Sequence, residues 1–500
     1  MKTIRFSALA LFFVATATLA DLPVEIKVDW AGRLPAVIKN PDKFGLITPH
    51  AADPAADGVW SESEGVATWR YAVRIPGAVN VSLHADPFNL PEGATFKLIG
   101  GGQSYLHTNQ SDAPFGVLWS RVVSGDEARI EIAVPAGKKS ELGFRLVEVV
   151  AGFKGLFGDP AMNETYRRLT MRPMAGGSDG ANGCRVNFDC AKTAANAEQS
   201  RATVLFTTAD SQCTGTLINN RRNDKKNYVV TAYHCQTSER GQVSQPNVRV
   251  YWVPLTPCGQ ALAVNNGLSP STAGATSRAE FGVHSTISNQ GTFVNGDSWL
   301  LELAAAPPAG VSVYYAGYDA TDATPTNAFG IHHGAGTAQQ HVDWGGSAQK
   351  DDGFALNTIR FWQMTSLMGV VEGGASGSAL WDQNSRHIGV LSGSSPGNAG
   401  PSCTSAQSNG AAYNRFAQFW AGDGTASNSA RFWLDPDSTG NKVLDGVGVS
   451  APPPAPPPPP PPPPPTVQPA AGAASTGGGF GIEVLWVLAL VTGCRRKVRR

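Results

Sequence analysis

The chain has 500 residues, which is enough for roughly two to four domains and a sizeable buried core. Its 39 Lys and Arg residues balance its 39 Asp and Glu residues, so no global field favours nucleic acid or an anionic surface as a partner. Gly, Ser, Thr, Asn and short apolar runs dominate, whereas the long amphipathic stripes of a helical bundle are scarce. The composition therefore predicts a mostly β protein whose partners must be inferred from its sites.

Residues 1–20 are typical of a secretory signal peptide. Lys2 and Arg5 precede a uniformly apolar stretch, and small residues up to Ala20 mark a cleavage site before Asp21. The alternative, a buried first strand, fits a charged start followed by so apolar a body less well. We therefore expect the rest of the chain to be exported.

Residues 21–177 contain no cysteine and predict a β-rich N-terminal domain. Apolar and polar residues alternate in four stretches, which are 67–75, 79–85, 128–134 and 143–150. Such period-2 runs between Pro and Gly turns indicate an antiparallel sheet, most simply in a β-sandwich. The small residues at 172–183 mark a domain boundary and a natural site for proteolytic cleavage.

Residues 178–449 again consist of short apolar runs separated by turns. The runs begin at positions 202, 213, 226, 248, 297 and 386, and a last one, from 411, ends in a helical pattern. No repeat of about 20 to 50 residues occurs, which argues against a propeller or a solenoid. We expect an all-β domain built from a pair of closed β-barrels.

Residues 450–475 and 476–500 predict a linker and a sorting tail. The proline run cannot pack and should form an extended spacer. The tail has glycines, an apolar stretch at 480–491 that is shorter than the ~20 residues of a spanning helix, and a basic end that should stay cytoplasmic. It resembles the glycine-glycine sorting tails that a rhomboid-like intramembrane peptidase cuts, and a permanent weak anchor is the alternative. We expect a secreted or cell-surface protein that meets export and tail-processing machinery and contacts the membrane only through this tail.

Six cysteines lie in the second domain, and an even number in an exported chain indicates three disulfides. They are Cys184, Cys190, Cys213, Cys235, Cys258 and Cys403. Six cysteines allow about fifteen pairings, so their positions alone fix none. A seventh, Cys494, lies in the tail and is either lipidated or spare.

Three polar residues stand where nucleophilic catalysis needs them, at the ends of apolar strands. His234 directly follows one such strand, Asp297 directly precedes another, and Ser376 lies between glycines in the sequence GGASGSA. An imidazole can remove the proton of a serine hydroxyl when a carboxylate fixes its tautomer and stabilises its cation. The chain order His, Asp, Ser is that of chymotrypsin, and the spacing suits one barrel carrying the first two residues and a second carrying the serine.

The small residues around Ser376 have a chemical explanation. A tetrahedral acyl-transfer intermediate needs backbone N–H donors aimed at one oxygen, each stabilising the transition state by ~3 kcal/mol. The loop can supply them from Gly374 and Ser376, while Gly377 allows a close approach that a side chain would block.

Four other polar residues are rivals for these roles. Ser378 lies in the same loop, but the Gly-x-Ser-Gly pattern favours Ser376 as the nucleophile. Asp351 and Asp352 occupy a polar QKDDG turn, where solvated side chains are expected. Glu372 is either a pocket carboxylate or part of a loop salt bridge, and we expect the salt bridge.

The adjacent His332 and His333 raise the question of a metal site. Neighbours on a strand point to opposite faces, however, and no matching Cys or Asp set follows them. We expect structural or surface roles for both, and core packing for Trp420 and Trp433. No metal and no cofactor is predicted.

From residue 180 to 449 the motifs resemble those of secreted lysyl endopeptidases and related bacterial trypsin-like serine peptidases, a branch of the chymotrypsin-like double-barrel fold. The motifs stand in the same order and are CTGTLINN, TAYHC, GDSWLLELAAA, YYAGYDA, IHHGAG, VDWGG, EGGASGSALW and FWLDPDSTG. The resemblance implies that His234 is the general base, that Asp297 orients it and that Ser376 is the nucleophile. It also implies that Gly374 and Ser376 donate to the oxyanion.

The same resemblance implies the disulfides Cys184–Cys403, Cys190–Cys258 and Cys213–Cys235. The β-rich stretch ahead of residue 177 is similar to the propeptides of such proteases. It therefore implies a zymogen that matures by cleavage near residues 172–183.

The sequence departs from the family in the region of the specificity pocket. Members that cleave after lysine carry an aspartate where this sequence has Ala411 and a histidine where it has Ser392, although Trp344 is retained. A lysine ammonium in a pocket without a carboxylate would be an unpaired charge, which is costly to bury. We therefore predict an uncharged P1 residue, with Val370, Gly393 and Ala411 as further pocket lining.

Together these features predict a monomeric, exported serine endopeptidase that acts on proteins or peptides. A noncatalytic surface-binding protein that keeps a protease-like fold is one alternative, and an esterase with the same triad is another. Labelling by a fluorophosphonate tests the first alternative, and comparison of peptide with ester substrates tests the second.

Overall fold

The computed structural model describes residues 22–109, 116–157, 159–170, 185–238, 241–242, 248–252, 255–260, 270–273, 275–282, 295–308, 310–353, 359–394 and 410–449. The predicted signal peptide, cleavage region, proline-rich linker, sorting tail and Cys184–Cys403 disulfide lie outside these residues. The described residues belong to one compact unit, so the domain boundary near residue 177 stays a prediction. In this described part of the chain, no helix is both long and apolar enough to cross a membrane.

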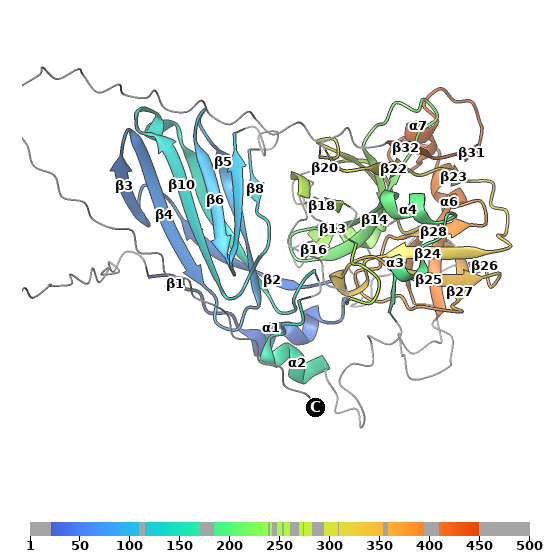
Figure 1. Cartoon of the computed structure of the whole chain (residues 1–500), viewed down its shortest axis with the longest axis horizontal. Helices are drawn as coiled ribbons and strands as arrows, with labels where there is room; N and C mark the ends of the chain where they lie inside the picture. Colours follow the sequence, from blue (N-terminus) through green and yellow to red (C-terminus); the bar gives the residue numbers. More distant parts are fainter. Residues whose placement is uncertain are drawn as a thin grey trace, which may run out of the picture. The chain divides into compact units, whose positions relative to one another are not determined.

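The N-terminal part forms two sheets (Figure 1), and its alternating residues bury one face of each. In β4 (Val66–Arg74), for example, the side chains of Ala67, Trp69, Tyr71 and Val73 are buried and those between them are not. One apolar cluster contains residues of both sheets, among them Trp69 of the first and Leu83 of the second. The predicted β-sandwich is therefore confirmed.

The first of these sheets has the order β1 (Val24–Glu25), β4, β10 (Glu127–Pro135), β6 (Thr95–Gly100) and β7 (Gln103–Thr108), with β3 (Val59–Ser63) paired to β4. The second has the order β2 (Gly45–Ala52), β11 (Gly143–Gly152), β5 (Asn80–Asn89) and β8 (Leu118–Trp119), with β9 (Val123–Ser124) paired to β5. The pairing is antiparallel as expected, except that β1 runs parallel to β4. The helices are α1 (Trp30–Val37), the 3₁₀ helix η2 (Ala136–Glu141) and α2 (Glu164–Thr170).

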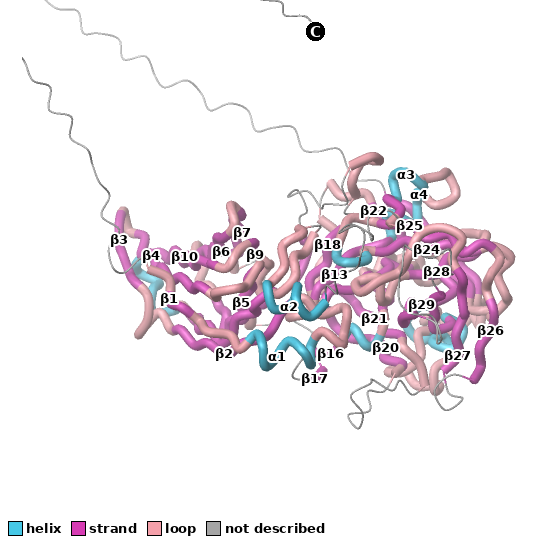
Figure 2. Tube along the Cα trace, turned by 90° about the horizontal axis from the view of Figure 1, so that it is seen from below, coloured by secondary structure: helices cyan, strands magenta, loops and turns pink. Residues whose placement is uncertain are grey.

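The apolar runs of the C-terminal part form two larger sheets, and Figure 2 shows that the regular elements of the described trace are mainly strands, with few helices. The seven-stranded sheet has the order β19 (Pro270–Ala273), β18 (Arg249–Trp252), β13 (Thr203–Thr207), β14 (Gln212–Ile218), β15 (Tyr228–Thr231), β21 (Ser298–Leu303) and β20 (Ala275–Phe281). The ten-stranded sheet has the order β12 (Val186–Asn187), β25 (Gln340–Gly345), β24 (Ala328–His332), β28 (Ala379–Asp382), β29 (His387–Ser394), β30 (Gly410–Arg415), β27 (Ile359–Thr365) and β26 (Gln349–Gly353), with β23 (Tyr318–Asp319) and β31 (Val443–Leu444) alongside.

Short elements complete this part of the chain. They are the ribbons β16 (Thr237–Ser238) with β17 (Gly241–Gln242) and β22 (Val313–Tyr315) with β32 (Val447–Val449), the helices α3 (Phe188–Ala191), α4 (Ala197–Ala202), α6 (Phe416–Ala421) and α7 (Arg431–Leu434), and the 3₁₀ helices η3 (Tyr233–Gln236) and η5 (Gly334–Gly336). The run from residue 411 is a strand followed by a helix, as predicted. The expected mostly β fold is confirmed.

The two larger sheets share an apolar core, which holds the site-bearing loops at their junction. One cluster joins Val204 and Leu300 of the seven-stranded sheet to Val390 of the ten-stranded sheet. Trp420 lies in this cluster and Trp433 packs against it partly buried, so the predicted core packing of both is confirmed.

The prediction of a turn at Asp351 and Asp352 is wrong, whereas the Asp352 side chain is exposed to solvent as expected. Both residues lie in β26, where Asp352 forms an ion pair with Arg415 and Asp351 accepts a hydrogen bond from Gln363. Arg415 also pairs with Asp322. Its side chain is buried, and a buried guanidinium needs carboxylates around it, which is why the polar strand is ordered there.

Trp69→Ala should lower the free energy of unfolding by about 3–5 kcal/mol, because removal of a fully buried indole leaves a large cavity. Trp60 is the matched control: it lies opposite Trp69 across β3 and β4, is half-buried, and also donates its indole N–H to a carbonyl of the 53–57 turn. Trp60→Ala should cost about half as much or less. Chemical denaturation of the full chain carrying Ser376→Ala, followed by circular dichroism, measures both, and equal losses would contradict this packing.

Candidate active site

His234 lies on the short helix η3, which directly follows the buried strand β15. The disulfide Cys213–Cys235 ties this helix to the neighbouring strand β14. A second disulfide joins Cys190 and Cys258. Two of the three pairings that the resemblance implies are therefore confirmed. The sulfur atoms of Cys213 and Cys235 lie close to the imidazole of His234, but in a disulfide they are not thiolate ligands for a metal.

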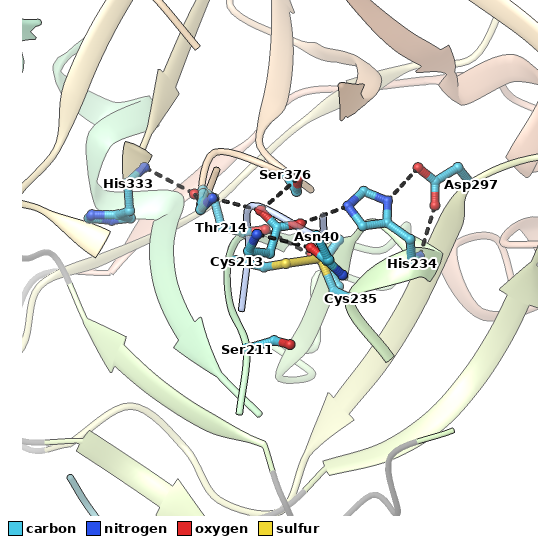
Figure 3. Close-up of a disulfide and its surroundings, with 12 residues drawn as sticks. Asn40, Ser211, Cys213, Thr214, His234, Cys235, Asp297, His333 and Ser376 are labelled. Atoms are coloured by element: carbon cyan, nitrogen blue, oxygen red, sulfur yellow. Dashed lines mark hydrogen bonds and ion pairs between the residues drawn. A yellow bond between two sulfur atoms is a disulfide. The ribbon is translucent and has the colours of Figure 1, made fainter. Parts of the chain in front are cut away.

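Asp297 directly precedes β21, and its side chain is fully buried. Its Oδ1 accepts the backbone N–H of His234 at 2.9 Å, and its Oδ2 lies 2.8 Å from Nδ1 of the same residue (Figure 3). Because both carboxylate oxygens bind one residue, the imidazole is fixed in orientation and its Nδ1 carries the proton that Asp297 accepts. The structure thus brings together the predicted base and the predicted acid.

A residue that the sequence analysis did not single out holds Asp297 from the other sheet. The side-chain oxygen of Asn414, in β30, accepts the N–H of Asp297 at 3.2 Å and the hydroxyl of Ser298 at 2.7 Å. The side-chain nitrogen donates to the Arg360 carbonyl and to Gln418. This buried amide therefore joins the two sheets exactly where the acid sits, and its sequence context, AAYNRF, gives no sign of that role because the role depends on strand order.

The loop that contains Ser376 comes from the ten-stranded sheet and is held by Thr214 of the seven-stranded sheet. The Thr214 N–H donates to the Ser376 carbonyl at 2.8 Å, and its hydroxyl donates to the Gly374 carbonyl at 2.8 Å. Gly374 and Gly377 have φ of +94° and +84°, where glycine is favoured. A Cβ on Gly377 would lie 2.1 Å from the hydroxyl oxygen of Thr231, so the expected close approach is present.

An unpredicted carboxylate lies between the serine and the histidine. Asp42, in the turn between α1 and β2, is buried, and its Oδ2 lies 3.1 Å from Nε2 of His234. Its Oδ1 accepts the N–H of Gly374 at 2.7 Å and the hydroxyl of Ser376 at 3.3 Å. The predicted base, the predicted nucleophile and one predicted oxyanion donor therefore meet at a single carboxylate.

The two carboxylates set the charge of His234. Burial alone would lower the pKa of its imidazole, but Asp297 and Asp42 raise that pKa to about 10. Burial alone would raise the pKa of Asp42, but the hydrogen bond and charge of His234, together with the Gly374 N–H, hold it below its ordinary value. At neutral pH the site therefore contains an imidazolium between two carboxylates.

The rival residues take structural positions. Ser378 is fully buried, and the serine hydroxyl that donates to Asp42 is that of Ser376. Glu372 forms the expected salt bridge, with Arg185 at 2.6 Å. His332, the last residue of the interior strand β24, and His333, which directly follows it, are both fully buried, so the surface alternative is wrong for them.

The predicted pocket residues lie mostly on neighbouring strands of the ten-stranded sheet. Ser392 and Gly393 belong to β29, which pairs with the strand that carries Ala411. Ala411 and Trp344 are fully buried in one apolar cluster. Val370 is buried just ahead of the serine loop. The structure thus gathers these residues near the loop, and their role in specificity stays a prediction.

The charge state of the histidines can be measured by NMR of the full chain carrying Ser376→Ala and labelled histidine. His234 should stay protonated from about pH 5 to about pH 8, because its pKa is raised to about 10. The controls are His333 and His387, which should stay neutral because burial lowers their pKa to about 4 and about 3. Asp42→Asn should lower the pKa of His234 by removing one carboxylate. Titration of His234 near its ordinary value in the unaltered site would contradict the geometry.

Residues 178–414 match the family model described as lysyl endopeptidase, C-terminal domain. The lysyl endopeptidase of Pseudomonas aeruginosa is 28% identical to this chain over 336 residues, which cover 63% of this chain and 66% of that protein. The chain thus spans slightly less than two thirds of the relative that it matches.

Solved structures with similarity to the chain include the inactive form of a serine-to-alanine mutant of Rv3671c from Mycobacterium tuberculosis H37Rv, which is 14% identical and covers 49% of this chain and 91% of its own, with a TM-score of 0.29. A Glu endopeptidase is 16% identical and covers 50% of this chain and 96% of its own, also with a TM-score of 0.29. The family match and the curated relative support a trypsin-like serine peptidase that is similar to the lysyl endopeptidases, as the motifs indicated.

Proposed function

We propose that the protein is a secreted serine endopeptidase, made as a zymogen, that hydrolyses peptide bonds through an acyl-enzyme on Ser376. One observation carries this proposal: the His234 imidazole, the Ser376 hydroxyl and the Gly374 N–H all bind one carboxylate. Peptide hydrolysis generates a tetrahedral oxyanion and then a carboxylate product, and both would lie next to the nucleophile, the base and the backbone donors. A set of donors that binds a carboxylate there is suited to stabilise both.

In the acylation half of the reaction, which requires that Asp42 has left the site and that Nε2 of His234 is unprotonated, the Ser376 oxygen attacks the carbonyl carbon of the scissile peptide bond while Nε2 takes the hydroxyl proton. The carbonyl oxygen becomes negative and accepts hydrogen bonds from the N–H groups of Gly374 and Ser376. Asp297 stabilises the imidazolium through Nδ1. The C–N bond then breaks, the leaving amine takes the proton from His234, and an ester between Ser376 and the substrate remains.

In the deacylation half, a water molecule takes the place of the departed amine. Nε2 of His234 removes one of its protons as its oxygen attacks the ester carbon, and a second tetrahedral oxyanion forms. Its collapse breaks the bond to the Ser376 oxygen, which recovers its proton from His234. The products are a carboxylic acid, ionised at neutral pH, and the regenerated enzyme, and no metal or cofactor enters either half.

Export and zymogen maturation rest on the sequence and on the disulfides. The charged and apolar start of the chain is that of a signal peptide, and disulfides persist in oxidising compartments outside the cytoplasm. We place the maturation cut near residues 172–183, between the sandwich and the peptidase domain. The tail is then either removed by a sorting peptidase or retained as a weak anchor.

The pocket proposed for the P1 side chain is uncharged. Ala411 lies in an apolar cluster with Trp344 and Leu391, where a buried aspartate would be needed to pair a lysine ammonium. The nearby carboxylate of Glu372 is already paired with Arg185. An apolar or small uncharged P1 residue suits such surroundings.

Ser376→Ala should abolish labelling of the processed enzyme by a fluorophosphonate, because the nucleophilic oxygen is absent. Asp297→Asn should lower kcat by about four orders of magnitude, because the amide favours the wrong tautomer of His234. Ser378→Ala is the matched control from the same loop and should keep the labelling. Retained labelling in Ser376→Ala would favour a different nucleophile, and absent labelling in the unaltered enzyme would favour a binding protein. Kinetics with protein, peptide and ester substrates test the remaining alternative, because cleavage of esters alone would favour an esterase.

A peptide-library profile of the processed enzyme should show cleavage after uncharged residues. Ala411→Asp should shift this preference toward Lys or Arg by about tenfold or more, since a buried carboxylate would then pair the incoming cation. Ala412→Asp, on the adjacent position of β30, is the control because successive strand residues face opposite sides. Dominant cleavage after Lys or Arg by the unaltered enzyme would reject the proposed pocket.

A further inference from the structure

The turn that carries Asp42 is docked on the peptidase domain through its main chain. The Asp42 carbonyl accepts the N–H of Gln212 at 3.0 Å, and the N–H of Phe44 donates to the Asp210 carbonyl at 2.8 Å. Between these two bonds, Lys43 pairs with Ser211 as an antiparallel β-bridge. The turn thus adds a short strand to the segment that leads into β14, much as an extended peptide binds to a sheet edge.

Side chains on either side of Asp42 strengthen this docking. Lys43 forms an ion pair with Asp210 at 2.7 Å, and both side chains are buried. On the other side of Asp42, Nζ of Lys154, which belongs to the N-terminal part itself, donates to the Pro41 carbonyl at 2.6 Å and holds the turn to its own domain. A buried charge pair of this kind depends on good geometry, so it fixes the register of the turn and brings the Asp42 carboxylate to one place.

The turn itself is built to present that carboxylate. The Asp42 N–H donates to the side-chain oxygen of Asn40 at 2.9 Å, and the Lys43 N–H donates to the Asn40 carbonyl at 3.2 Å. Asparagine stabilises tight turns by such local bonds. Asp42 therefore protrudes from a preorganised turn, in the way that a rigid inhibitor loop presents a side chain.

Two groups that contact Asp42, the His234 ring and the Gly374 N–H, are already oriented for the proposed reaction. Asp297 holds Nδ1 of His234, and Gly374 has the left-handed conformation that aims its N–H at the carboxylate. The His234 ring and the Gly374 N–H are therefore already held in the orientations that the proposed reaction uses. The Asp42 carboxylate occupies the place of the oxyanion and pairs with the base, so the site is blocked by occupation rather than by distortion.

We propose that the N-terminal domain is a carboxylate-based inhibitor of the peptidase domain, in which Asp42 fills the oxyanion site and forms an ion pair with the general base. This inference rests on the proposed function and specifies how that site is controlled. It means that activity starts when the turn leaves the cleft, so cleavage near residues 172–183 is not sufficient while the cut domain stays docked. In this proposal Lys43 anchors the turn to the peptidase domain, and Asp42 blocks the oxyanion site and pairs with the base.

This arrangement makes a size-dependent prediction. Asp42→Ala removes the carboxylate but leaves the main chain of residues 41–44 paired with the segment before β14. A small fluorophosphonate should then reach Ser376 in the uncut chain, whereas a protein substrate should still be excluded. If distortion of the site were the cause of inhibition, neither the fluorophosphonate nor the protein substrate would react with the Asp42→Ala chain.

The test is the initial rate of fluorophosphonate labelling of the full-length, uncut chain, resolved from processed enzyme on a gel. Asp42→Ala should label about tenfold faster or more than the unaltered chain, because contacts to three groups are lost. Asp42→Asn keeps the shape of the side chain and an acceptor for the Gly374 N–H but loses the charge, so its labelling rate should lie between those of the unaltered chain and Asp42→Ala. This variant also provides a test if Asp42→Ala folds poorly. Asp53→Ala, in an exposed turn of the same domain, is the matched control and should leave the rate unchanged.

The possible results separate the two levels of the proposal. Fast labelling of both Asp42 variants, with slow labelling of the unaltered and Asp53→Ala chains, supports the inhibitor role. Equal rates in all uncut chains, whether fast or slow, while processed enzyme labels rapidly, overturn that role but leave the peptidase assignment standing. Processed enzyme that does not label at all overturns the assignment itself and the inference with it.

Discussion

The buried carboxylate of Asp297 binds one residue with both of its oxygens, the main chain of His234 through one and its ring through the other. This double contact fixes where Nε2 points, and everything that meets at Nε2 depends on it. Asn414 holds the acid from the ten-stranded sheet, while Thr214 holds the serine loop from the seven-stranded sheet. Each sheet therefore holds a residue group of the other at their junction, so the distance between the proposed base and the proposed nucleophile is set by packing of the shared core rather than by either loop alone.

An imidazolium between two carboxylates explains how the site can have its groups aligned and still be inactive. Asp297 is fully buried and part of the peptidase domain, so its interaction with His234 remains whatever happens to the N-terminal domain. Asp42 reaches the ring from a different part of the chain, and its contribution is lost when the turn undocks. Removal of one carboxylate lowers the proton affinity of Nε2 and frees the N–H of Gly374 at the same time. The proposed base and the proposed oxyanion donor are thus released together.

The sequence predicts those parts of the site that lie in local patterns. Strand-end positions identify His234 and Asp297, the glycine pattern identifies Ser376, and period-2 alternation identifies the sandwich. It does not predict Asn414 or Thr214, because their roles come from which strands lie side by side, and it does not predict Asp42, because a single aspartate in a polar turn has no periodic or spacing signal. The polar strand at Asp351 and Asp352 was missed for a related reason: the partner that orders it, Arg415, is distant in the sequence.

The most direct measurement is a crystal structure of the full-length, uncut chain carrying Ser376→Ala. The geometry described here predicts that Asp42 lies within hydrogen-bonding distance of both the Gly374 N–H and Nε2 of His234, with Asp297 on Nδ1 of the same ring. A site filled by water or by another segment, with the turn at Asp42 away from the cleft, would contradict inhibition by occupation. An imidazole turned away from Asp297 would contradict the assembled site on which the whole account depends.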